Sequence, residues 1–210
     1  MAIDNRRIST DLCARVSCLL PEDVKFLRRW YSRCMATEKK SAEIRLFTEQ
    51  DAQALWDLRM LALETDPWSF VDSPEELRAM SVEEFATRLR ADHAENFIVG
   101  AFEQDCAVGM VGCYQEVPLK RRHKGWIWGV VVTPAARGRG IGKSLMRAAI
   151  HRAKSIPGLE MLLLTVGVGQ PVPRKLYGSL GFRSFGVEPR GLKIGNESHD
   201  EENMVLEFSK

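Results

Sequence analysis

The residues best suited to chemistry form a glycine-rich loop, Arg137-Gly138-Arg139-Gly140-Ile141-Gly142-Lys143. An apolar stretch of strand character, Trp126 to Val132, precedes it, and a stretch with helical apolar spacing follows it. Glycines let the backbone approach a ligand closely, and the first turn of a helix presents N–H groups without partners in the helix. The helix dipole and nearby basic side chains attract anions. The loop therefore predicts a phosphate or pyrophosphate site.

Two common phosphate-binding patterns fail on spacing. The Walker pattern G-x-x-x-x-G-K-[ST] would end at Gly142-Lys143-Ser144, but it requires a glycine where Arg137 stands. The dinucleotide pattern G-x-G-x-x-G fits Gly138 and Gly140 but meets Lys143 at its last position. The spacing therefore disfavours an ATPase, a kinase or a dinucleotide-binding enzyme.

A third pattern, [Gln/Arg]-x-x-Gly-x-[Gly/Ala], does fit at Arg137, Gly140 and Gly142, directly after Val132-Thr133-Pro134. Further along, the segment Leu176-Tyr177-Gly178-Ser179-Leu180-Gly181-Phe182 matches the pattern LYxxxGF, and Met204-Val205-Leu206 is typical of a closing strand. With these motifs in this order, residues 43–210 resemble the GNAT superfamily of N-acetyltransferases. The resemblance implies an enzyme that transfers an acetyl group from acetyl-CoA to an amine.

The resemblance also implies site residues. Backbone N–H groups of the loop would hold the pyrophosphate of coenzyme A, and the strand Val130, Val131 and Val132 would pair with its pantetheine arm and polarise the thioester. By its position in the LYxxxGF motif, Tyr177 matches the general acid of the family. A phenol with a pKa of roughly 10 is protonated at neutral pH and can donate to a departing thiolate. The alternative is that Tyr177 only packs its ring and binds pantetheine. Gln170 stands where the family often has Asn, and Pro171 and Pro173 alter the start of the following helix.

An amine must lose its proton before it attacks, so a general base is expected. Glu64, His199, Asp200 and Glu201 are the candidates, with solvated loop charges as the alternative interpretation. Aromatic walls for the acceptor are expected from Trp68, Phe70 and Trp128, although ordinary core packing would also explain them. The predicted acceptor-binding residues are Glu64, Phe70, Trp128 and His199.

Amino acids, polyamines, antibiotics and protein N-termini all stay open as acceptors, so the partner is a small-molecule or peptide amine. A function of a different class also stays open, a non-catalytic acyl-CoA-binding module that regulates a partner. Tyr177 favours catalysis, whereas the altered segment from Gln170 to Pro173 favours the module.

Composition excludes other classes. The 210 residues carry a net charge of only +2, with the basic excess near the N-terminus, so a nucleic-acid partner is not expected. No apolar stretch approaches the roughly 20 residues of a membrane span, and a cytoplasmic protein is the expectation. The five cysteines form no C-x-x-C pair and the four histidines no cluster, so no metal site is predicted.

Around the loop, periodicity predicts an alternation of strands and helices. Strands are expected at 43–47, 96–102, 107–114, 125–133, 161–166, 182–185 and 204–208, and helices after Thr48, Ser73, Ser81 and Gly142 and at 172–180. The polar run 196–203 is predicted to be a surface loop. The fold class is α/β (α+β), a GNAT fold with a central mixed, mostly antiparallel sheet flanked by helices, in a domain spanning 43–210.

Residues 1–42 are predicted to form an N-terminal extension that is partly helical. Val24, Leu27 and Tyr31 share one helical face, which needs a partner. The partner would be the domain itself or a second subunit, which makes a homodimer one of the expectations.

Overall fold

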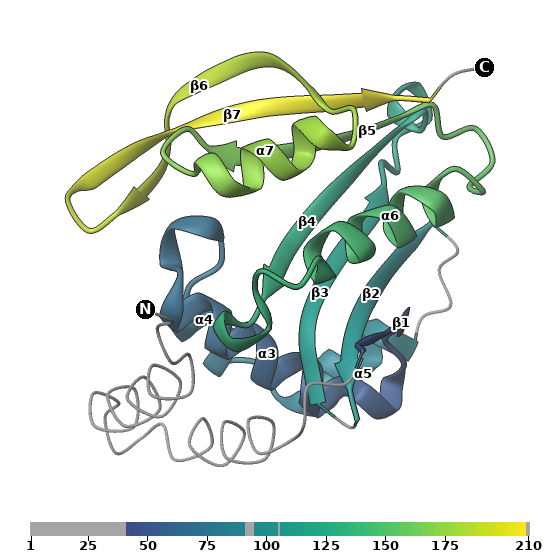
Figure 1. Ribbon diagram of the computed structural model, residues 1–210, viewed down its shortest axis with the longest axis vertical. Helices are drawn as coiled ribbons and strands as arrows, with labels where there is room; N and C mark the ends of the chain where they lie inside the picture. Colours follow the sequence, from purple (N-terminus) through teal and green to yellow (C-terminus); the bar gives the residue numbers. More distant parts are fainter. Residues whose placement is uncertain (1–40, 91–94, 105, 209–210) are drawn as a thin grey trace, which may run out of the picture. The chain divides into compact units, whose positions relative to one another are not determined.

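The computed structural model describes residues 41–90, 95–104 and 106–208 of the chain (Figure 1). The predicted helical face with Val24, Leu27 and Tyr31 lies outside the described residues. The predicted boundary between an extension at 1–42 and a domain at 43–210 therefore stays a prediction.

The described residues form strands and α-helices joined by short turns. The strands are β1 (Glu43–Leu46), β2 (Asn96–Glu103), β3 (Cys106–Gln115), β4 (Lys124–Val132), β5 (Met161–Gly167), β6 (Arg183–Ile194) and β7 (Glu197–Glu207). The α-helices are α3 (Ala52–Thr65), α4 (Pro74–Arg78), α5 (Val82–Arg90), α6 (Ile141–Ala153) and α7 (Pro171–Ser179). Single 3-10 turns are η2 (Glu49–Asp51), η3 (Pro67–Ser69), η4 (Leu119–Arg121) and η5 (Pro134–Ala136).

The strands of the described residues make one seven-stranded sheet in the order β1-β2-β3-β4-β5-β7-β6. Neighbouring strands pair antiparallel except for β4 and β5, which are parallel. The exception follows from connectivity, because α6 carries the chain from the end of β4 back to the start of β5. The predicted mixed, mostly antiparallel sheet flanked by helices is confirmed.

Local capping signals in the sequence are realised in the helix starts. The Thr48 N–H donates to Asp51 Oδ2 at 2.8 Å, and Ser73 and Glu76 exchange bonds of 2.7 and 3.2 Å. Ser81 and Glu84 do the same at 2.8 and 3.1 Å. Each pair satisfies N–H groups that the first helical turn leaves without partners, which explains why these helices begin there.

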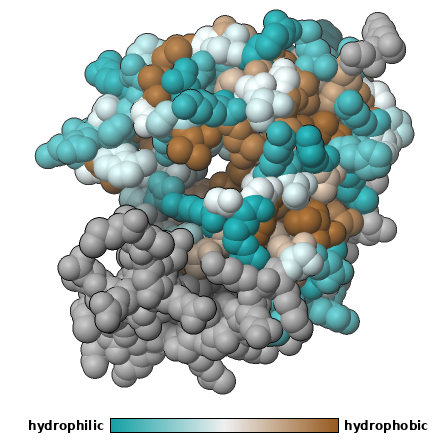
Figure 2. Space-filling view, in the orientation of Figure 1, coloured by the Kyte–Doolittle hydropathy of each residue, from teal (hydrophilic) through white to brown (hydrophobic). Residues whose placement is uncertain are grey.

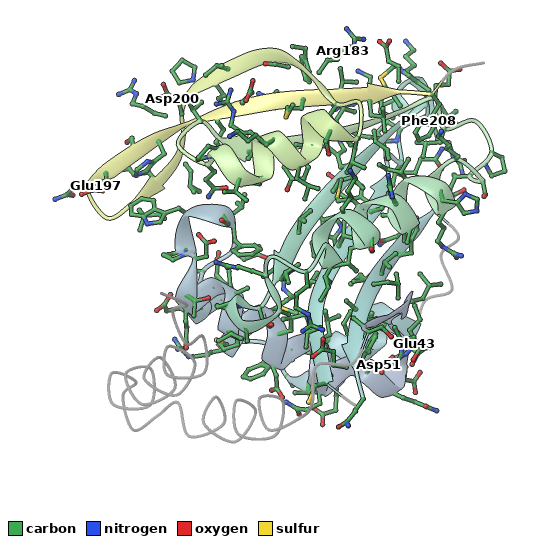
Figure 3. All side chains as sticks on the ribbon, in the orientation of Figure 1. Glu43, Asp51, Arg183, Glu197, Asp200 and Phe208 are labelled. Carbon is green, nitrogen blue, oxygen red and sulfur yellow. The ribbon has the colours of Figure 1, made fainter. Side chains whose placement is uncertain are left out.

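The prediction of a surface loop at 196–203 is wrong. Gly195 and Asn196 form the turn of a long hairpin, and β7 begins at Glu197, which marks the hairpin tip in Figure 3. The strand is polar because its partner β6 is an edge strand whose residues 183–190 are all exposed. Backbone pairing holds such a hairpin together without the alternating apolar pattern that identifies a half-buried strand.

Helices cover both faces of the sheet. On one face, Leu145, Met146 and Ala149 of α6 pack against Val111 and Cys113 of β3 in a buried cluster. The neighbouring β3 residues Met110 and Gly112 point to the other face, where α3 and α5 lie, since successive residues of a strand face opposite sides. In Figure 1, α6 crosses in front of the sheet and α3 lies behind it.

Candidate active site

The two parallel strands separate shortly after they meet. β4 and β5 pair only at Lys124–Met161, Gly125–Leu162 and Trp126–Leu163, and then diverge (Figure 1). Beyond Trp126, one edge of β4 continues to pair with β3, while the described residues place no strand against its other edge. This edge offers unpaired backbone N–H and C=O groups to an extended ligand.

A bulge in β4 accompanies the separation. Between the pairs Gly112–Trp128 and Met110–Val131, β4 advances by three residues while β3 advances by two. Gly129 supplies the extra residue with φ +61°, a left-handed conformation that favours glycine. A bulge bends its strand and increases the local twist, and it therefore reorients the segment from Val130 to Val132.

A cavity of about 660 Å³ lies in the opening between β4 and β5. Two of its lining residues, Leu164 and Val166, belong to the core cluster on the α6 side of the sheet. Thr165, which lies between them on β5, also lines the cavity, and its side chain points to the opposite face. Since residues of both faces line it, the cavity passes through the sheet. Figure 2 shows a hollow in the middle of this view, with largely apolar atoms around it.

The glycine-rich loop forms the cavity wall where α6 begins. Gly138 and Gly140 adopt φ values of +74° and +78°, and no atom lies within 4 Å of the position that a Cβ would occupy on either. The first intrahelical bond is donated by the Ser144 N–H to Gly140 O at 3.1 Å. The N–H groups of Ile141, Gly142 and Lys143 precede that bond, so the helix offers them no acceptor.

The two arginines of the loop have different places. Arg137 lines the cavity, its Nε donates to Val132 O at 3.0 Å, and its backbone N–H donates to Pro134 O at 3.4 Å. Arg139 does not line this cavity; its guanidinium lies 2.5 Å from Glu103. Arg137 thus holds the end of β4, and its own backbone N–H already has an acceptor.

Tyr177 lies near the end of α7, lines the cavity and is only 6% exposed. The helix end fixes it: the Phe182 N–H donates to Tyr177 O at 3.2 Å and the Gly181 N–H to Gly178 O at 3.1 Å. Together with φ +94° at Gly181, these bonds make a Schellman motif. The glycine and phenylalanine of the LYxxxGF motif therefore end the helix, and Phe182 packs its ring 6.1 Å from that of Tyr177.

Burial raises the pKa of the Tyr177 phenol above its ordinary value, because the phenolate would lose its hydration. The side chain is therefore protonated throughout the neutral and mildly alkaline range. A protonated phenol at the wall of this cavity can donate a proton or a hydrogen bond to a ligand atom.

Gln170 lines the cavity at the start of α7. Its Nε2 donates to Ser69 Oγ at 2.8 Å and to Trp68 O at 3.2 Å, across more than one hundred residues of sequence. The amide therefore fixes the η3 connection, a contact that the sequence did not suggest. Trp68 and Phe70 of this connection line the same cavity.

The structure brings most predicted site residues together. The cavity lining includes the following: Val130, Val131, Val132, Arg137, Gly138, Gly140, Ile141, Gly142, Lys143, Gln170, Tyr177, Phe70 and Trp128. Two predicted acceptor residues do not line it. Glu64 lies 2.5 Å from Arg78, and the ring of His199 packs edge-on against Trp68 with centroids 4.1 Å apart.

Sequence reasoning missed Asp66 and Thr165, which also line the cavity. Asp66 ends α3, and Thr165 donates to Asn203 Oδ1 at 3.3 Å across the β5–β7 pair. No local motif marks either residue, because only the strand register and the fold of the η3 connection bring them here.

Trp128 lines both this cavity and a second one of about 470 Å³ next to α3, α4 and α5. Its indole lies across Gly112, where an added Cβ would come within 2.1 Å of the ring. The Arg59 guanidinium, paired with Asp72, lies 5.2 Å from the centre of the indole. Trp128 therefore forms a partition between the two cavities, and Gly112 leaves the space for it.

Gly112→Ala is expected to displace the indole and to lower the free energy of unfolding by roughly 1–3 kcal/mol, the usual cost of overpacking. Urea unfolding measures this. Gly186→Ala is the matched control, because Gly186 also lies in a strand but has no atom within 4 Å of its Cβ position. Equal stabilities of the two variants would contradict the partition.

Among the described residues, no helix is long and apolar enough to cross a bilayer.

Comparison with known proteins matches this chain to acetyltransferases. The model of the acetyltransferase (GNAT) family matches residues 52–182, which is more than half of the chain. The chain is also 23% identical over 145 residues to the spermidine N(1)-acetyltransferase of Vibrio cholerae, an alignment that covers 69% of this chain and 78% of that protein.

Solved structures share the fold. An acetyltransferase of the GNAT family from Streptococcus pneumoniae superimposes with a TM-score of 0.73 at 25% identity, covering 80% of this chain and 99% of that one. A putative acetyltransferase from Salmonella typhimurium, whose structure holds acetyl-CoA, gives a TM-score of 0.69 at 16% identity and covers 81% and 96% of the two chains.

Proposed function

The chain belongs to the acetyltransferase (GNAT) family, whose members transfer the acetyl group of acetyl-CoA to amines, and on this premise we propose that it N-acetylates a small, positively charged primary amine. The observation that carries the proposal is a cavity that runs through the sheet between an anion-binding helix start and a protonated tyrosine. Transfer by direct attack needs both reactants in one such space.

The residues present fit coenzyme A. Gly138 and Gly140 leave open space next to the free N–H groups of α6, which suits a pyrophosphate, and Lys143 adds positive charge to the cavity wall. The unpaired edge of β4 from Val130 to Val132 suits the amide-bearing pantetheine arm. When bound, acetyl-CoA supplies the thioester that donates the acetyl group.

Tyr177 would hold a proton at Oη for the departing sulfur. Burial keeps its phenol protonated, and the hydrogen bonds of the helix end fix its backbone. The backbone N–H groups of the β4 segment near Val130 would polarise the acyl carbonyl. Gln170 would hold Trp68 and the η3 connection in place to form the wall next to the acceptor.

Two observations support a cationic acceptor. The carboxylate of Glu201, which has no ion-pair partner among the described residues, and that of Asp66, which lies 3.9 Å from Arg137, line the cavity together with the aromatic side chains Trp68, Phe70 and Trp128. Carboxylates attract an ammonium group, and aromatic faces stabilise a cation through their quadrupole. The Vibrio cholerae relative is named for spermidine, which is a polyamine of this chemical class.

The proposal is tested by following thiol release from acetyl-CoA with spermidine, other diamines and polyamines, amino acids and short peptides. Cationic amines without a carboxylate are expected to give the highest kcat/KM. Coenzyme A binding in calorimetry without turnover of any amine would instead favour a non-catalytic acyl-CoA-binding module. A preference for anionic acceptors would contradict the proposed acceptor class.

A further inference from the structure

The two ends of the cavity through the sheet differ in chemistry. The side beside α6 and α7 carries the N–H groups of Ile141, Gly142 and Lys143, for which the helix offers no acceptor, and the phenol of Tyr177. The other end carries Thr165, Glu201 and the η3 residues Trp68 and Phe70. A cofactor held at the first end leaves the second end to the acceptor amine.

The position of Glu201 at the second end follows from the alternation of side chains along β7. Its neighbour Glu202 is paired with Arg174 of α7, and therefore faces α7. Successive residues of a strand face opposite sides, so Glu201 faces away from α7. Glu201 is paired in register with Gly167, the last residue of β5, where β4 and β5 are already apart.

Among the four candidate bases from the sequence, only Glu201 lines the cavity. Glu64 is held by Arg78 at 2.5 Å. Asp200 is exposed, and its Oδ1 accepts the Arg190 N–H at 2.8 Å. His199 packs its ring against Trp68. The structure thus distinguishes one of four candidates that the sequence left equivalent.

The strand opposite Glu201 leaves room for its side chain. β6 bulges opposite it, between Glu188 and Leu192, and an added Cβ on Gly191 would come within 2.8 Å of Glu201 Oε2. Gly191 therefore leaves the space that the side chain occupies. Within the described part of the chain, no cationic side chain forms an ion pair with Glu201, in contrast to Glu202.

Two features of its surroundings raise the proton affinity of Glu201. Burial and the negative charge of Glu188, directly opposite on β6, raise the pKa of the Glu201 carboxyl above its ordinary value. His199 lies two residues away on the same side of β7. From other elements, Lys143, Asp66 and Arg137 line the same cavity, and the last two lie 3.9 Å apart. A carboxylate with a raised pKa is better suited to accept a proton at neutral pH.

We propose that Glu201 binds the ammonium group of the acceptor and takes up its proton, on the side of the sheet opposite Tyr177. This inference rests on the proposed function. One proton passes from the ammonium nitrogen to Glu201, the neutral nitrogen forms the bond to the acyl carbon, and the carbon–sulfur bond breaks. The sulfur keeps the electron pair and takes the proton of Tyr177. The second nitrogen proton restores Tyr177, and Glu201 releases its proton to solvent.

Glu201→Gln tests the proposal, because it keeps the shape and removes the proton acceptor. With an amine substrate of the wild type, kcat/KM at pH 7 is expected to fall about 10²-fold, while coenzyme A affinity in calorimetry stays the same. The deficit is expected to shrink below about tenfold near pH 10, because the free amine then forms in solution without a base. An equal rate at pH 7, or a deficit that does not change with pH, would overturn the assignment.

Glu188→Gln is the second variant, and it leaves Glu201 in place. Removing the opposite negative charge lowers the pKa of Glu201, so the pH at which kcat/KM falls on the acidic side is expected to move to a lower value. A profile that coincides with that of the wild type would show that Glu201 is not the titrating group. If the wild type turns over no amine at all, both the proposed function and this inference fail. If the wild type is active and both variants match its pH profile, only the role of Glu201 is overturned.

Discussion

Replacing Tyr177 by Phe is expected to slow the acetyl-transfer step by roughly 10²–10⁴-fold, the usual contribution of a positioned acid. The variant loses one hydroxyl and keeps the ring that packs 6.1 Å from Phe182. The Schellman bonds at the end of α7 involve only backbone atoms, so the helix end stays intact. Single-turnover measurement with saturating amine is the right assay, because product release can hide a slower chemical step in the steady state.

Tyr114→Phe is the matched control for this variant. Tyr114 lies on β3, is 39% exposed and does not line the cavity. Its loss of a hydroxyl is expected to leave the single-turnover rate and coenzyme A affinity unchanged. A Tyr177→Phe variant as fast as Tyr114→Phe from neutral to alkaline pH would show that Tyr177 is structural.

Gly140→Val is expected to weaken coenzyme A binding by at least about 10²-fold. A residue with a Cβ at φ +78° costs roughly 1–2 kcal/mol, and a distorted loop loses charge-assisted hydrogen bonds worth about 1.5–3 kcal/mol each. Since each 1.4 kcal/mol corresponds to a factor of ten, the loss of two such hydrogen bonds, about 3–6 kcal/mol, lowers the affinity by at least about two orders of magnitude. Isothermal titration calorimetry with coenzyme A measures the effect.

Gly158→Val separates ligand binding from backbone strain. Gly158 has φ +76° and no atom within 4 Å of its Cβ position, which matches Gly140, but it follows the far end of α6 and does not line the cavity. Both variants are expected to lose similar stability, whereas only Gly140→Val is expected to lose affinity. Equal affinity in the two variants would remove the loop from the binding site.

The patterns that the sequence resolved by itself are local ones. The glycine-rich loop, the three capping pairs and the LYxxxGF helix end all depend on contacts within a few residues, so residue type and spacing are enough to identify them. The mostly antiparallel sheet was also predictable, because its hairpins and apolar strands alternate along the chain. The family itself followed from these motifs and their order.

Contacts between segments far apart in the chain could not be predicted from the sequence. Only the tertiary structure shows that β4 and β5 pair at three positions and then separate, so that a cavity crosses the sheet between them. The bulge at Gly129, the hydrogen bonds of Gln170 to the η3 connection and the position of Glu201 all depend on register between strands or segments far apart in the chain. A shift of one residue in register turns a side chain to the other face of the sheet, and polar strands such as β7 carry no apolar alternation to reveal that register.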